Sequence, residues 1–285
     1  MTTSPISSSS SPLDPDTSSV KIGNTQVKCY NCHHKDLTIK AVKEQIEVAT
    51  LIQCASNLST LQMTGLDASA STIFTLSKTI NEELQGKRLT TFQSAADMCN
   101  QVDPSGEWLK RVLPDGEGDT LASFASVLQE VMIKMGVHPN PTIKTETVSY
   151  KSENLQLQHT VTDQFRTLLV THLIHPPHGQ TNFVIVNCDQ ALTINGALGM
   201  NGGVGSKISP GEYGGNFCIV GGFNKEHDRV LLLDLDLAYP AEGSSPAKES
   251  GIYWVPLADL ADAMNTWDDI AKSNRGYLSF SLTTA

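Results

Sequence analysis

The sequence lacks long apolar runs, contains few cysteines and carries fewer basic than acidic residues. No stretch approaches about 18 consecutive apolar residues, the length that a transmembrane helix needs, so no membrane span is expected. Lysine and arginine number 20 against 30 aspartates and glutamates, and the net charge of −10 disfavours nucleic-acid binding. The N-terminus has no basic segment followed by an apolar one, and its first lysine is Lys21. These absences predict a cytoplasmic protein with neither a membrane nor a nucleic-acid partner.

Cysteine is scarce, with six residues among 285, which is too few for a disulfide scaffold. We expect reduced thiols, several of which fill space in the core. Two of them form the pattern Cys29-x-x-Cys32, followed by His33 and His34. Cys29, Cys32 and His33 are candidate metal ligands, because thiolates suit zinc and softer ions such as cadmium. The alternative is a polar segment without metal, since no second C-x-x-C pair completes a tetrahedral site. No organic cofactor is expected.

Composition divides the chain into a tail and one domain. The first 20 residues hold 14 Ser, Thr or Pro residues and cannot bury enough apolar area to offset the entropy of ordering. Residues 1–25 are therefore predicted to be a disordered tail, and residues 26–285 to form a single domain. The hydrophobic fraction of 39% is sufficient for a core of ordinary size.

The spacing of apolar residues changes along this domain from helical to strand-like. Steps of three and four residues predict helices over 39–52, 72–85 and 120–135. After about residue 145, short apolar runs bounded by Gly, Asn and Pro predict buried strands. These runs are 166–173, 182–188, 217–223, 229–235 and 277–282, with a hairpin loop at 224–228. Helices followed by an antiparallel sheet predict an α+β fold.

The segment from Gly215 to Met264 contains the most informative motif. It runs G-N-F-C-I-V-G-G-F-N, then V-L-L-L-D, Y-P and W-V-P-L-A-D-L-A-D-A-M. It resembles the C-terminal half of the phytochelatin synthase catalytic domain, where a Gly-His-Phe strand precedes an aliphatic strand ending in Asp. Asp234 follows Asn216 by 18 residues, the separation of His and Asp in that family. Upstream, the segment that begins at Cys54 resembles the helix headed by the family's nucleophilic cysteine.

The resemblance implies a papain-like fold, in which the helical N-terminal half packs on the sheet of the C-terminal half. It also implies transfer of γ-glutamylcysteine: a Cys thiolate attacks the Cys–Gly peptide of glutathione, glycine leaves, and a second glutathione accepts the acyl group. Glutathione and metal ions are the implied partners, with cadmium or zinc entering as the glutathione thiolate complex. The implied catalytic positions are Cys54, Asn216 and Asp234, and the candidate substrate contacts are Gln53, Gly215 and Phe217.

Two positions depart from the family pattern. Asn216 occupies the position of the catalytic histidine, and an amide neither titrates near neutrality nor carries charge. It therefore cannot pair with a thiolate or protonate a leaving amine, and this assistance is worth roughly 10²–10⁴ in rate. Val48 occupies the position of the oxyanion-hole glutamine, whose donor is worth about 2.7–4 kcal/mol. Gln53 supplies an amide in its place only if the local turn differs.

Other residues do not obviously replace the missing groups. His175, His178 and His227 are expected at the far ends of their strands if the neighbouring strands are antiparallel. Cys54 is a nucleophile if it begins a helix, where the helix dipole lowers a thiol pKa, and an inert core thiol if the helix over 39–52 continues through it. Residues 197–205 are glycine-rich, which predicts a mobile loop beside the cleft rather than a phosphate cradle.

Two functions from different classes follow. The first is a phytochelatin synthase-like transferase or peptidase that uses Cys54, with altered assistance at Asn216 and Asp234. The second is a catalytically inactive relative that retains the fold as a glutathione- or metal-binding subunit or an interaction partner.

Overall fold

The structure is a computed structural model, and its described part covers ten segments of the chain. These are residues 19–22, 25–28, 68–84, 89–113, 116–137, 143–150, 155–175, 177–199, 214–234 and 251–283. The predicted helix over 39–52 lies outside them. A small hairpin of β1 (Ser19–Ile22) and β2 (Thr25–Lys28) begins inside the segment 1–25 that was predicted to be a tail.

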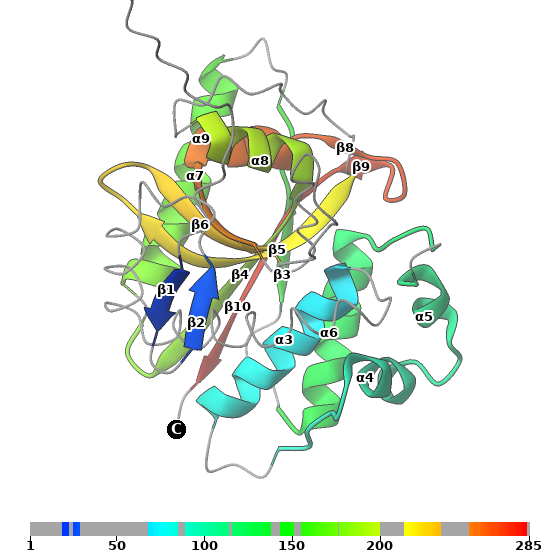
Figure 1. The fold of residues 1–285 in the computed structure, drawn as a ribbon. Coiled ribbons are helices and arrows are strands. Elements are labelled where there is room, and N and C mark those ends of the chain that lie inside the picture. Colours follow the sequence, from blue (N-terminus) through cyan, green and yellow to red (C-terminus); the bar gives the residue numbers. More distant parts are fainter. Residues whose placement is uncertain are drawn as a thin grey trace, which may run out of the picture.

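An antiparallel six-stranded sheet forms the centre of the described part (Figure 1). Its strand order is β3-β10-β4-β5-β6-β7, and every neighbouring pair is antiparallel. The strands are β3 (Lys144–Thr147), β4 (Gln180–Asp189), β5 (Gly215–Asn224), β6 (Arg229–Asp234), β7 (Gly251–Pro256) and β10 (Gly276–Thr283). Four of the five predicted strands and the hairpin turn between β5 and β6 are thereby confirmed.

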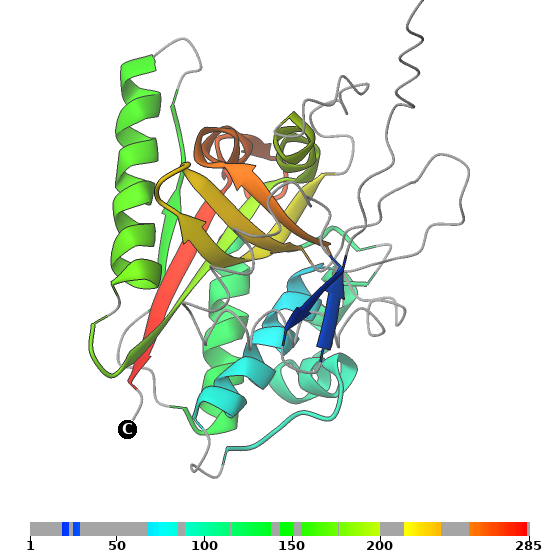
Figure 2. The same ribbon diagram turned by 60° about the vertical axis from the view of Figure 1, so that its left-hand side comes forward.

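Helices cover both faces of this sheet (Figures 1 and 2). One face packs on α3 (Ala68–Glu83) and α6 (Leu121–Met135), and α4 (Ala95–Val102) packs on these two helices, with α5 (Glu107–Arg111) next to α4. The other face packs on α7 (Leu155–Leu169), α8 (Gln190–Gly199) and α9 (Leu257–Met264). A two-stranded ribbon of β8 (Trp267–Asp268) and β9 (Ser273–Asn274) precedes β10. The α+β class is confirmed.

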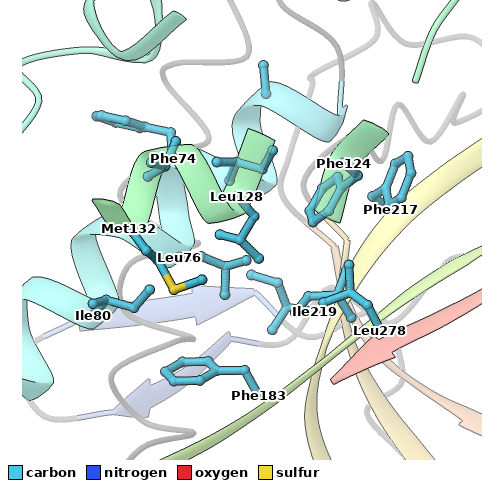
Figure 3. Close-up of a cluster of buried hydrophobic side chains, with 14 of the residues drawn as sticks. Phe74, Leu76, Ile80, Phe124, Leu128, Met132, Phe183, Phe217, Ile219 and Leu278 are labelled. Atoms are coloured by element: carbon cyan, nitrogen blue, oxygen red, sulfur yellow. The ribbon is translucent and has the colours of Figure 1, made fainter. Parts of the chain in front are cut away.

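Alternation along the strands sends successive side chains to the two helical layers. In β5, Phe217 and Ile219 face α3 and α6, whereas Cys218 and Val220 face α7, α8 and α9. Phe217 stacks on Phe124 of α6 with ring centroids 4.4 Å apart (Figure 3). The helical half and the sheet therefore share one continuous core, and the strands of the sheet are fixed in register by residues buried on both faces.

The predicted helix over 120–135 ends where its local signals place it. Thr120 caps the N-terminus of α6, because its side chain accepts a hydrogen bond from the Ser123 N–H. Gly136 ends the helix in the left-handed region, with φ of 83°, and its N–H is bonded to carbonyls of the last turn. The helix predicted over 72–85 is α3, which begins four residues earlier, at Ala68.

The family-like motif W-V-P-L is the junction between β7 and α9. Trp254 and Val255 lie near the end of the strand and are fully buried, and Pro256, the last strand residue, is also the N-cap of α9. Leu257, the first helical residue, is 1% exposed, and four further residues of α9 are buried. The motif is therefore a packing motif, and Trp254 is a core aromatic.

Two predictions of local structure were wrong. Residues 166–173 were predicted to form a strand, but they are the end of α7 and part of a π-helical turn, η3 (Val170–Ile174). A short apolar run has no periodicity that separates a buried strand from a buried helix. The glycine-rich loop was predicted from residue 197, but α8 continues to Gly199. The remainder of that loop lies outside the described residues. Among the helices that are described, none has both the length and the apolarity to cross a membrane.

Candidate active site

The ends of three strands and the start of one helix meet at one edge of the sheet. Cys188 near the end of β4 is opposite Asn216 near the start of β5, and Asp234 at the end of β6 is opposite Cys218. Helix α8 starts directly after β4, with Gln190 as its first residue. Because neighbouring antiparallel strands run in opposite directions, the end of β4, the start of β5 and the end of β6 lie side by side. This strand pairing brings Cys188, Asn216 and Asp234 together.

Asn216 and Asp234 are directly hydrogen-bonded. The Asn216 Nδ2 donates to Asp234 Oδ1 at 2.7 Å, and both side chains are buried, with 2% and 0% exposure. Asp234 Oδ2 accepts a second hydrogen bond, at 3.2 Å, from the Nε2 of Gln190. Each carboxylate oxygen therefore has an amide donor, as a buried carboxylate requires.

The geometry of this pair matches the role expected of a histidine at position 216. An asparagine Nδ2 and a histidine Nδ1 are attached to the same carbon, the γ-carbon of the side chain. The Asn216 N–H therefore makes the hydrogen bond that an imidazole Nδ1–H would make to an orienting carboxylate. The other branch of the amide, Oδ1, is buried and has no hydrogen-bond partner. It is an acceptor that cannot supply a proton.

Two thiols flank Asn216 on the same face of the sheet. Cys188 Sγ lies 3.9 Å from the Asn216 carbonyl oxygen, and Asn216 Nδ2 lies 3.7 Å from Cys218 Sγ. Both cysteines are fully buried and, like Cys99, form no disulfide. This confirms for these three the prediction of reduced cysteines in the core. Within the described residues, no three His, Cys, Asp or Glu side chains are grouped as a metal site would require.

A second polar cluster lies on the other face of the same strand ends. Arg275 forms an ion pair with Asp268, with Nη1 and Oδ2 3.5 Å apart, and Nη1 donates to Asn187 Oδ1 at 3.2 Å. Two donors of this cluster, Arg275 Nε and Asn187 Nδ2, are buried without a hydrogen-bond partner. The guanidinium also lies against Gly215, the residue next to Asn216. Two hydrogen-bond donors without partners, beside the positive charge of the guanidinium, are suited to bind an anion such as a carboxylate.

The structure places some of the predicted site residues and leaves others outside its described part. Asn216, Asp234 and Gly215 lie at the strand ends described above. Phe217 is 5% exposed and packs on Phe124, while its carbonyl accepts a hydrogen bond from Thr72 Oγ1 at 3.2 Å. The nucleophile candidate, the possible oxyanion donor and the metal-ligand candidates all lie outside the described residues; they are Cys54, Gln53, Val48, Cys29, Cys32, His33 and His34.

The candidate replacement histidines lie at the opposite end of the sheet, as predicted. β4 and β5 are antiparallel, so His175 and His178, which precede β4, are far from its end at Asp189. His227 lies in the turn after β5, beyond Asn224. Asn216 and Asn224 are eight residues apart, roughly 26 Å along a strand. None of these three imidazoles can therefore replace the function of a histidine at position 216.

Sequence reasoning missed Gln190, Asn187 and Arg275. Gln190 is 44 residues from Asp234, and Arg275 is 88 residues from Asn187. No local motif marks such contacts. The one available signal was the presence of polar residues at the ends of strongly apolar strands, as in the sequence N-C-D at the end of β4 and the Gln190 that follows it.

The fold and the two clusters define a class of protein. It is an α+β protein whose antiparallel sheet carries a buried amide–carboxylate pair at its edge, with an arginine cluster on the opposite face. Comparison with known proteins finds a family match over part of the chain. Residues 204–277 match the family model described as phytochelatin synthase. This segment, which contains both clusters except Asn187, Cys188 and Gln190, is similar to phytochelatin synthase, so the resemblance seen in the sequence is confirmed for these residues.

A curated relative has a related name. The chain is 40% identical over 68 residues to "Glutathione gamma-glutamylcysteinyltransferase 3" of Lotus japonicus. The match covers 24% of this chain and 12% of the relative. Because most of the relative has no counterpart in this match, its activity as a whole protein is not transferred to this chain by the comparison.

Proposed function

We propose that this chain is a phytochelatin synthase-like transferase with a papain-like arrangement of its site. Its substrate is glutathione, whose γ-glutamylcysteinyl group passes to a second glutathione or to water. The observation that carries the proposal is the hydrogen bond of 2.7 Å between Asn216 and Asp234, two positions with the family's spacing. The family match over residues 204–277 supports the same substrate class.

The proposed reaction proceeds through an acyl-enzyme. The thiolate of Cys54 attacks the carbonyl carbon of the Cys–Gly peptide, a C–S bond forms, the C–N bond breaks, and glycine leaves as its nitrogen takes a proton from solvent water. The amine of a second glutathione then attacks the thioester: a C–N bond forms, the amine loses a proton to water, the C–S bond breaks, and the Cys54 thiolate is released. Cadmium or zinc enters as a glutathione thiolate complex and is part of the substrate. Gln53 is proposed to contact the substrate, and Cys29, Cys32 and His33 are proposed as a separate set of metal ligands.

The Arg275 cluster is the proposed anchor for glutathione. Glutathione carries two carboxylates, and Arg275 Nε with Asn187 Nδ2 supplies two unpaired donors for one of them. Asp268 faces the same guanidinium and offers an acceptor for an ammonium group. A γ-glutamyl end, which carries a carboxylate and an ammonium on one carbon, has complementary chemistry. Gly215 is exposed, and its lack of a side chain lets the Arg275 guanidinium lie beside it at the start of β5.

One observation favours a second function, that of a catalytically inactive relative. Asn216 cannot form an ion pair with a thiolate or protonate a leaving amine. A chain with this residue binds glutathione or its metal complex through the Arg275 cluster without turnover, as a binding or interaction subunit. The two functions share the substrate and differ only in chemistry at Cys54.

A mass-spectrometric assay with glutathione and Cd²⁺ distinguishes them. The transferase releases glycine and forms (γ-Glu-Cys)n-Gly, and both products vanish in Cys54→Ala. Cys99→Ala is the matched control, because Cys99 is a buried thiol of α4 in the helical layer. Absence of product from folded protein that binds glutathione would establish the inactive relative. Absence of both product and binding would refute the proposed substrate.

A further inference from the structure

Gln190 occupies a junction between three elements. It is the first residue of α8, directly after β4, and is 6% exposed. Its backbone N–H donates to the carbonyl of Gly214 at 3.2 Å, just before β5, and its side chain reaches Asp234 at the end of β6. The Thr193 hydroxyl binds the Gln190 carbonyl at 2.9 Å, so the first turn of the helix holds this residue in place.

The two amide donors act on different oxygens of one carboxylate. Asn216 donates to Asp234 Oδ1, and Gln190 donates to Oδ2. The torsion that rotates a carboxylate has a broad, two-fold profile, so a single hydrogen bond fixes it weakly. A second donor on the other oxygen fixes the plane of the group. Gln190 therefore helps to hold the Asp234 carboxylate in the plane in which one of its oxygens faces residue 216.

We propose that Gln190 is the positioning residue of this site, which holds the Asp234 carboxylate so that residue 216 is oriented by it. The inference rests on the proposed function in one respect: it takes residue 216 and Asp234 to be the reactive end of the site. Gln190 touches neither substrate nor reacting atoms. It acts through Asp234, in the manner of the outer groups that orient histidine ligands and catalytic imidazoles.

The orientation of residue 216 has a direct chemical consequence. With Asp234 fixed, the Asn216 amide directs its NH₂ to the carboxylate and its Oδ1 away from it. An imidazole introduced by Asn216→His would donate Nδ1–H to Asp234 and leave Nε2, on the far side of the ring from the γ-carbon, as the free acceptor. Without the Gln190 donor, the carboxylate rotates and this tautomer loses its preference.

The test uses ¹⁵N NMR on folded full-length protein to determine the tautomer of an imidazole introduced at residue 216. The spectra are recorded at a pH above the pKa of that imidazole, where the ring is neutral. Asn216→His is compared with the double variant that adds Gln190→Met, a side chain of similar length without a hydrogen-bond donor. The Nδ1–H form is expected to dominate in Asn216→His and to lose its dominance with Gln190→Met. Thr79→Val is the matched control, because it removes a buried hydrogen bond from a threonine hydroxyl to a helix carbonyl in α3, in the helical layer on the other face of the sheet. Its addition to Asn216→His is expected to leave the tautomer unchanged.

Three results would overturn the inference: retention of the Nδ1–H form with Gln190→Met, an equal loss with Thr79→Val, or absence of that form from Asn216→His. If the double variant does not fold, Gln190→Met alone supplies the measurement. Exchange of the Asn216 side-chain amide protons is then expected to accelerate, on the order of tenfold, which is the scale of one hydrogen bond. An unchanged exchange rate would reject the proposal. Because neither readout needs turnover, an inactive protein tests the inference as well as an active one.

Discussion

The guanidinium of Arg275 occupies the space beside the α-carbon of Gly215. A β-carbon at residue 215 would lie 1.8 Å from Arg275 Nη1 and 2.4 Å from Cζ. The absence of a side chain at this position is therefore what lets the arginine lie over the start of β5, next to Asn216. Glycine is required at residue 215 because the guanidinium approaches its backbone closely. Gly215 therefore joins the Arg275 cluster to the neighbouring Asn216–Asp234 pair.

Gly215→Ala is expected to displace the guanidinium and to weaken glutathione binding by about tenfold or more, since charge-assisted hydrogen bonds are lost. Binding is measured through tryptophan fluorescence, because Trp267 is 55% exposed beside Asp268 whereas Trp108 and Trp254 are buried. Asn224→Ala, at the other end of β5, serves as the control and should leave affinity unchanged. Equal affinities for Gly215→Ala and the parent protein would show that the ligand does not use Arg275.

Asn216→His is expected to raise the rate of γ-glutamylcysteine transfer by at least about 10², the lower range for general acid–base assistance. The Asp234 Oδ1 that now accepts the Asn216 N–H at 2.7 Å is available to an imidazole. The rate should also gain a pH-dependent limb from the imidazole, whose ordinary pKa is about 6.5. The measurement is glycine release against pH. Asn216→Gln, which retains an amide, should produce no gain, and a similar rate for both variants would contradict this role of position 216.

Asp234→Leu is expected to lower the free energy of unfolding by about 2–4 kcal/mol, because the substitution leaves the amide N–H groups of Asn216 and Gln190 buried without an acceptor. Urea denaturation followed by circular dichroism gives the value, provided that the m-value is unchanged. Asp163→Asn is the comparison, since Asp163 is largely exposed and pairs with Arg166 on the surface of α7. If the free energy of unfolding falls no more for Asp234→Leu than for Asp163→Asn, the hydrogen bonds of Asp234 to Asn216 and Gln190 contribute nothing to stability.

His172 is expected to make the protein less stable in mild acid. Burial of the ring, with a contribution from nearby Lys144, lowers the pKa of His172 below its ordinary value, although the Leu168 carbonyl, 3.1 Å from Nδ1, opposes the shift. A folded-state pKa below the unfolded value of about 6.5 means that the unfolded state binds more protons. The free energy of unfolding therefore falls as the pH drops below about 6.5 and through the folded-state pKa.

The measurement is urea denaturation at several pH values between about 7 and 5. His172→Gln removes the titrating group and should flatten this pH dependence, and Lys144→Gln should flatten it in part by removing the nearby positive charge. Curves for His172→Gln that follow those of the parent protein at every pH would exclude His172 as a source of the acid sensitivity.

Local patterns in the sequence predicted much of the fold because each pattern has a short-range cause. The apolar steps over 120–135, with Thr120 before them and Gly136 after them, are the face and caps of α6. The apolar runs of β4, β5 and β6 are buried on both sides. The prediction of a strand at 166–173 was wrong because eight apolar-rich residues fit a buried helix as well as a strand. Here they form the end of a helix that packs against the sheet.

The sequence by itself determined the α+β class, the family-like segment and the positions of Asn216 and Asp234, because these depend on residue types and spacings along the chain. Tertiary structure decided which groups surround them. The antiparallel pairing of β4, β5 and β6 brought Gln190 to Asp234 across 44 residues, and the return of β10 beside β4 brought Arg275 to Asn187 across 88. Hydrogen bonds between buried side chains depend on how strands pair and which face each residue occupies, and these are set by the packing of the whole core.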